Sequence, residues 1–163
     1  MARKPKFTTP KNTLKEKVGE GGIPAYLLKQ TQTFLESNPV DFTPYARRFL
    51  EDLEIVKGNI EKRKIEPDLA MKEMVNVIMQ LKSNGSMFHY QLISMVSDVM
   101  LRFLEKAKKL DEDFLEIFNV YIKTLGIIVN KKLTGNAGRE GYALTQELHN
   151  ACLRYYSKYG ISH

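Results

Sequence analysis

The sequence has little cysteine, no tryptophan and no long apolar run, and these scarcities exclude several classes of protein. Its single cysteine, Cys152, can form neither an internal disulfide nor a thiolate metal cluster, which is typical of a reducing compartment. The most apolar stretch, Tyr90 to Leu104, is interrupted by Asp98 and Arg102, so no run of about 18 apolar residues is present to span a membrane. The N-terminus also lacks an apolar signal segment. We therefore expect a soluble, cytoplasmic protein.

The chain also lacks the short motifs that mark common active sites. Its three histidines, His89, His149 and His163, include no pair spaced four residues apart, the spacing that places two imidazoles on one helical face for zinc. Phosphate-binding lysine loops, dinucleotide turns and nucleophile elbows are missing as well. We expect no metal site, no cofactor and no complete catalytic apparatus.

The net charge of +6 is concentrated near the N-terminus. Residues 1–22 hold six of the basic side chains and two of the acidic ones, together with several prolines and glycines. This composition predicts a flexible basic tail over residues 1–22, followed by a single domain over residues 23–160. Nucleic-acid binding by the basic tail together with the helical body is an alternative function, although no helix-turn-helix signature or basic helix face accompanies it.

Apolar residues recur at helical spacing along the rest of the chain. The pattern and its capping residues predict helices over about 24–37, 43–66, 67–83, 92–104, 111–134 and 142–159. The segment Ser83–Ser86 is expected to loosen or end the third of them. Short connections and the absence of alternating strand patterns predict an all-α, up-and-down bundle, with a four-helix core and about six helices in total.

The stretch Val77–Leu92 joins the third and fourth predicted helices and carries the most functional information. Helical spacing places Met79 on one face with an apolar residue four positions before it and a lysine three after it. Small residues follow, and they would let the backbone of another protein approach closely. One interpretation is a docking surface made of Val75, Met79, Lys82, Ser83, Gly85, Ser86, Phe88 and His89. The other is that Met79 and Val75 widen the core stripe.

This stretch resembles the histidine phosphotransfer domains of bacterial phosphorelays. The resemblance is to a divergent group with the motif His-Asp-Ile-Lys-Gly-Gln-Gly, followed by Phe-Gly-Tyr-Pro-Leu. The matching positions are the motif lysine, the second glycine and three residues of the following run: Lys82, Gly85, Phe88, Tyr90 and Leu92. The departures are Met79 for the phosphorylated histidine, Ser83 for the first glycine, and His89 and Gln91 for the later glycine and proline.

The resemblance implies a binding role without phosphotransfer. In that family the imidazole accepts a phosphoryl group from a receiver-domain aspartate, the lysine neutralises the developing charge, and the glycine admits the receiver. The thioether of Met79 has no proton to release and cannot hold a stable phosphoryl group. The implied function is a non-catalytic interaction module of bacterial two-component signalling that binds a receiver domain or a histidine kinase. Lys82 would face the partner's acidic pocket, and Phe88 would contribute apolar contact or belong to the core.

Two further alternatives concern the same helices. Glu73 and Asn76 are three residues apart and resemble the pair with which some chemotaxis phosphatases position a water to hydrolyse an aspartyl phosphate. An enzyme acting on receiver aspartyl phosphate is therefore a second hypothesis. Self-association into a homodimer through faces that carry methionine and phenylalanine also stays open.

Overall fold

The computed structural model of the chain describes residues 16–17, 22–37 and 41–161. Contacts within the chain divide it into two units, Met1–Pro39 and Val40–His163. The tail predicted over residues 1–22 lies almost entirely outside the described residues. The division after Pro39 also does not coincide with the domain limits predicted from the sequence, because residues 23–37 fall in the first unit.

The first unit contains helix α2, Ala25–Ser37. Pro24 lies immediately before it, and the carbonyl of Pro24 accepts hydrogen bonds from the amides of Leu27 and Leu28 at 2.9 and 3.2 Å. A proline at a helix start costs no internal hydrogen bond, because the first amides of a helix have no partner within it. The large apolar side chains described on this unit are exposed, among them Ile23, Tyr26 and Phe34.

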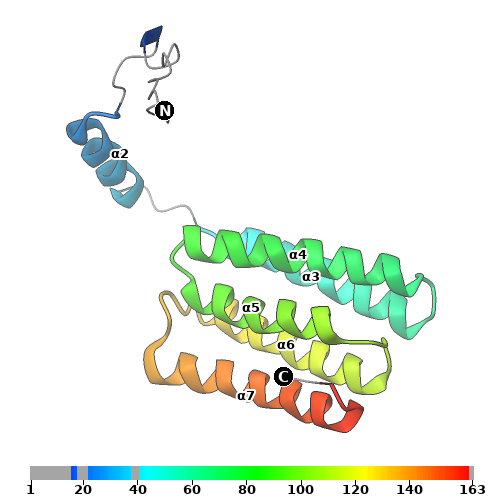
Figure 1. The fold of residues 1–163 in the computed structure, drawn as a ribbon. Coiled ribbons are helices and arrows are strands. Elements are labelled where there is room, and N and C mark those ends of the chain that lie inside the picture. The colour runs from blue at the N-terminus through cyan, green and yellow to red at the C-terminus, as the bar shows by residue number, and fades with distance from the viewer. Residues whose placement is uncertain (1–15, 18–21, 38–40, 162–163) are drawn as a thin grey trace, which may run out of the picture. The chain divides into compact units, whose positions relative to one another are not determined.

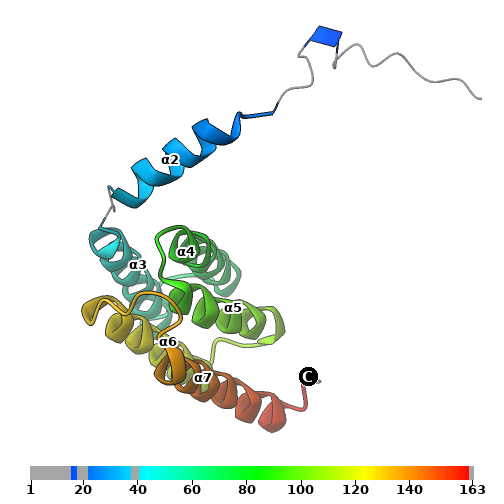
Figure 2. The same cartoon turned by 90° about the vertical axis from the view of Figure 1, so that its left-hand side faces the viewer.

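The second unit is a helical bundle. It is formed by α3 (Thr43–Glu61), α4 (Pro67–Met87), α5 (Gln91–Lys106), α6 (Glu112–Asn130) and α7 (Gly138–Tyr159). Helices α3 to α6 form a four-helix ring in which each contacts its two neighbours, and α7 packs against α5 and α6 (Figures 1 and 2). No strand occurs among the residues that the structure describes. The all-α fold class and the four-helix core predicted from the sequence are confirmed.

Residues at the helix ends explain where several of these helices start and stop. Pro44 and Pro67 occupy the first turns of α3 and α4, where proline is tolerated. At the start of α6 the carboxylate of Asp111 accepts a hydrogen bond from the amide of Phe114 at 3.0 Å, as expected of an N-cap. Helix α7 ends at Tyr159 and is followed by Gly160, whose left-handed φ of 62° suits glycine. These signals are local, which is why the sequence revealed them.

The core of the bundle is rich in aromatic rings. Phe103 of α5 stacks on Phe114 of α6 with ring centroids 5.4 Å apart and meets the edge of Tyr155 of α7 at 5.0 Å. The hydroxyl groups of Ser97 and Tyr121 form a buried hydrogen bond of 3.0 Å between α5 and α6. This bond satisfies two polar groups that would otherwise be costly to bury.

Helix α4 is longer than the sequence predicted. The segment Ser83–Ser86 was expected to loosen or end it, but α4 continues to Met87. The hydroxyl of Ser83 bonds the carbonyl of Gln80 within the helix, and the hydroxyl of Ser86 bonds that of Ser94 on α5 at 3.1 Å. Packing against α5 therefore outweighs the weak helix propensity of these residues.

Candidate functional site

Met79 lies near the middle of α4 and points away from the core. Its side chain is 57% exposed, whereas the buried stripe of the helix runs through Met74, Ile78 and Leu81. Val75 is only half-buried and packs against the core cluster. Met79 therefore fits the interpretation of this stretch as an outward surface, whereas Val75 fits the interpretation that it widens the core stripe.

Lys82 lies on the exposed side of α4, at the edge nearest α5. Its ammonium group is 2.5 Å from a carboxylate oxygen of Asp98, whose second oxygen accepts from Nε of Arg102 at 3.0 Å. The hydrogen bond from Lys82, helped by the charges of Lys82 and Arg102, lowers the pKa of Asp98 below its ordinary value. The cation expected to face a partner is therefore already paired, although both groups of the pair remain accessible to solvent.

Gly85 does not belong to the outward surface. It is buried, and a Cβ atom added there would lie 2.9 Å from Oγ of Ser94 and 3.1 Å from both Cβ of Ile93 and the carbonyl oxygen of Tyr90. The missing side chain lets α4 and α5 approach each other rather than admitting another protein. The expectation that Gly85 opens the surface to a partner is therefore wrong. Ser83 and Ser86 remain exposed.

The turn between α4 and α5 is built from the rest of the predicted site. Phe88 is half-buried and stacks on Phe42 with ring centroids 5.0 Å apart, so its ring serves the bundle. His89 is exposed and adopts a left-handed φ of 63°. Its carbonyl accepts from the amide of Gly135 at 2.6 Å, and the carbonyl of Gly135 accepts from the amide of Leu92 at 2.9 Å. Two backbone hydrogen bonds thus join this turn to the loop between α6 and α7.

Met87 belongs to the same surface and was missed by the sequence analysis. It is 65% exposed and follows Met79 by eight residues, a little over two helical turns. The signal was present as the four-residue spacing from Met79 through Ser83 to Met87. It was overlooked because α4 was expected to stop before Met87. We call the surface formed by Asn76, Met79, Lys82, Ser83 and Met87 the α4 outer face.

The two residues of the phosphatase hypothesis lie on the exposed side of α4. Glu73 and Asn76 are both exposed, and the side-chain amide of Gln80 donates to Oδ1 of Asn76 at 3.4 Å. The oxygen of Asn76 therefore has a partner within its own helix.

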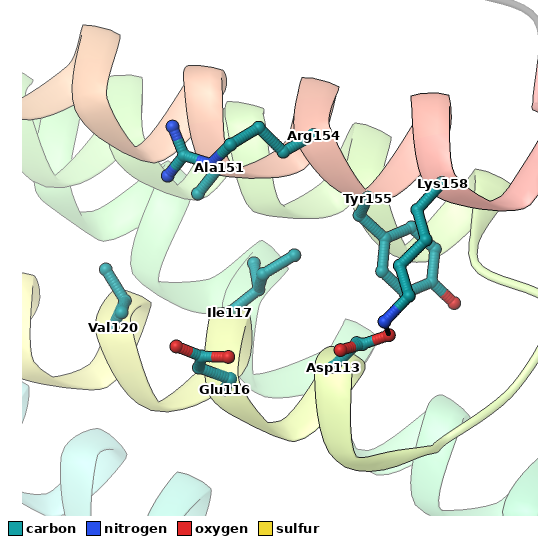
Figure 3. A pocket seen from close by; sticks show the side chains of 8 residues that line it. All are labelled: Asp113, Glu116, Ile117, Val120, Ala151, Arg154, Tyr155 and Lys158. Atoms are coloured by element: carbon teal, nitrogen blue, oxygen red, sulfur yellow. Dashed lines mark hydrogen bonds and ion pairs between the residues drawn. The ribbon is translucent and has the colours of Figure 1, made fainter.

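A separate small pocket lies between α6 and α7, far along the chain from α4. It measures about 200 Å³. Its lining residues are Asp113, Glu116, Ile117, Val120, Ala151, Arg154, Tyr155 and Lys158 (Figure 3). Lys158 closes one end with an ion pair to Asp113 at 2.5 Å, drawn as a dashed line in Figure 3. The pocket combines an ion pair with an apolar floor, and it contains no histidine or cysteine.

The described residues contain no cluster suited to metal binding and no activated thiol. They include no group of three or more histidine, cysteine, aspartate or glutamate side chains that could hold a metal ion. Cys152 is buried, and burial raises the pKa of its thiol to about 12. His149 is exposed and adjoins a groove between α5 and α7.

Two further findings concern membrane-spanning helices and similarity to known proteins. Each helix in the described part of the chain is too short or too polar to cross a membrane. No protein-family model, curated protein or solved structure matches the chain.

Proposed function

We propose that the protein is a non-catalytic interaction module of bacterial two-component signalling, which binds a receiver domain or a histidine kinase through the α4 outer face. One observation carries the proposal. Met79, which takes the place of the phosphorylated histidine in the resembled motif, is 57% exposed in the middle of an ordered helix. Lys82, which matches the motif lysine, is exposed three residues later.

The backbone of the turn after α4 supports the resemblance at positions where the side chains differ. The resembled motif has glycine where this chain has His89, and His89 adopts the left-handed φ of 63° that glycine favours. The motif has proline where this chain has Gln91, and Gln91 is the first residue of α5, a position that proline favours. Two backbone conformations therefore agree with the motif independently of its lost histidine.

The exposed side chains of Met79 and Lys82 suit binding to a partner without phosphoryl transfer. Fully burying a methionine side chain contributes about 1.5–3 kcal/mol, so covering the exposed part of Met79 would contribute roughly 1–1.5 kcal/mol, or about tenfold in affinity. Lys82 would exchange Asp98 for an acidic group of the partner. This exchange costs little, because a solvent-exposed ion pair contributes only about 0.2–1 kcal/mol.

The direct test measures binding to receiver domains and kinase domains encoded in the same genome. Receiver domains would be tested with and without phosphorylation by acetyl phosphate. We expect at least one domain to bind, Met79→Ala to weaken that binding about five- to tenfold, and Lys82→Glu to weaken it further. Ile55→Ala is the matched control, because Ile55 is an apolar side chain of α3 that is 61% exposed outside the α4 outer face. Equal losses for Met79→Ala and Ile55→Ala, or no binding to any domain, would contradict the proposal.

A gain-of-function variant tests the site more sharply. Met79→His returns an imidazole to the position that carries it in the resembled motif. In a His89→Gln background, this variant should acquire acid-labile phosphate from a phosphorylated receiver, whereas Met79→Gln should not. The unaltered protein should acquire none. Acid-labile phosphate on the unaltered protein that disappears in His89→Gln would instead establish His89 as a phosphoryl acceptor.

Mixtures of the protein with a phosphorylated receiver domain also test the phosphatase alternative. If Glu73 and Asn76 position a water, the phosphorylated receiver should lose its phosphate faster with the protein than alone. Asn76→Ala should abolish that acceleration. Unchanged phosphate loss would leave binding as the role of this surface.

A further inference from the structure

Six of the seven methionines lie in α4 and α5, and their exposure divides them sharply. Met79 and Met87 are 57% and 65% exposed, whereas Met74 and Met100 are completely buried at 0%. The remaining two in these helices are partly covered. The chain thus provides two accessible thioethers and two inaccessible ones within the same pair of helices.

The two accessible thioethers are also the apolar part of the α4 outer face. Met79 and Met87 flank the exposed Ser83, one helical turn on either side of it. Methionine is flexible and polarisable, so it adapts to a partner's surface. Any polar group added to these sulfur atoms would therefore appear in the middle of that face.

We propose that Met79 and Met87 form an oxidation site whose conversion to methionine sulfoxide closes the α4 outer face to its partner. The oxidant is a peroxide. The thioether sulfur attacks one oxygen of hydrogen peroxide with its lone pair, an S–O bond forms as the O–O bond breaks, and the proton of the transferred hydroxyl group passes to the other oxygen, which leaves as water. Each sulfur is oxidised by two electrons and each peroxide is reduced by two. Sulfoxide reductases of the thiol-dependent class reverse the step.

Because Met79 and Met87 are exposed, their oxidation should affect binding without affecting folding. A sulfoxide at Met79 or Met87 is solvated in the free protein, because most of each side chain already faces water. A partner that covers the face must then desolvate a strong acceptor without a matching donor, which is unfavourable. Oxidation at Met74, in contrast, would place a polar group inside the core. The docking consequence rests on the proposed function, whereas the oxidation pattern does not.

Limited treatment with hydrogen peroxide, followed by peptide mass spectrometry, tests the oxidation site directly. Met79 and Met87 should be oxidised at least ten times faster than Met74 and Met100, and the treated protein should keep its helical circular dichroism. Equal rates at exposed and buried methionines, or unfolding at low extents of oxidation, would overturn the proposal. Denatured protein is the control, in which the four rates should converge.

A second measurement tests the consequence for binding. Oxidation should weaken binding of the receiver or kinase domain at least tenfold. In a Met79→Leu/Met87→Leu variant, whose own affinity is measured first, the same treatment should cause no further loss of affinity. If treatment weakens binding equally in this variant, the two sulfur atoms are not the switch. If the untreated protein binds no such domain, the proposed function fails, and the oxidation pattern still decides whether the site exists.

Discussion

Replacing Gly85 with alanine tests how closely α4 and α5 approach each other. An alanine in a helix interior is favoured over glycine by about 1 kcal/mol. At Gly85 this gain is opposed, because the new Cβ would lie 2.9 Å from Oγ of Ser94 and 3.1 Å from a backbone carbonyl oxygen. Overpacking of this kind costs about 1–3 kcal/mol. We therefore expect Gly85→Ala to lower the free energy of unfolding by up to about 2 kcal/mol.

Two other helical glycines provide matched controls. A Cβ added at Gly58 of α3 or at Gly126 of α6 would meet no atom within 4 Å. Gly58→Ala and Gly126→Ala should therefore raise the free energy of unfolding by about 0.5–1 kcal/mol. Urea unfolding followed by far-ultraviolet circular dichroism would measure all three. A stabilisation by Gly85→Ala equal to that of the controls would refute the close packing of α4 on α5.

Three further predictions concern single side chains. His89→Gly should raise the free energy of unfolding by about 0.5–1 kcal/mol, because the strain of the left-handed φ of 63° that it relieves is larger than the cost of the greater chain entropy of glycine in the unfolded state. Urea midpoints would measure this gain, and a loss of stability would contradict the turn geometry. Ser97→Ala should cost about 1–3 kcal/mol by stranding the buried hydroxyl of Tyr121, whereas adding Tyr121→Phe should recover part of that loss. Strict additivity in this double-mutant cycle would contradict the hydrogen bond. Cys152 is buried with a thiol pKa raised to about 12, so at pH near 8 a disulfide reagent should label it only as fast as the protein unfolds; rapid labelling of native protein would be inconsistent with this burial.

The helices were predictable because they depend on local information. Apolar residues at helical spacing, Pro44 and Pro67 in first turns, and the N-cap Asp111 are all readable without knowledge of the fold. The end of α4 was not predictable in this way. It depends on hydrogen bonds and packing between Ser86 and Ser94 that exist only when α5 is in place.

The candidate site was predictable to a similar extent. Helical spacing left open whether Met79 is exposed or widens the core stripe, whereas Lys82 was expected to be exposed; in the structure both are exposed. The role of Gly85 could not be inferred, since a small residue serves equally well against a partner or against a neighbouring helix. Phe88 was left open for the same reason, and only its stacking on Phe42 assigns its ring to the bundle.

The hydrogen bonds that tie the α4–α5 turn to the α6–α7 loop have a consequence for how the molecule responds at a distance. They join His89 and Leu92 to Gly135, so the turn that follows α4 is anchored by a residue more than forty positions later in the chain. Gly135 has a φ of 67°, which a larger side chain would adopt only with strain. A change in that distant loop would therefore loosen the end of α4 and alter the presentation of Met87 without touching any atom of the surface itself.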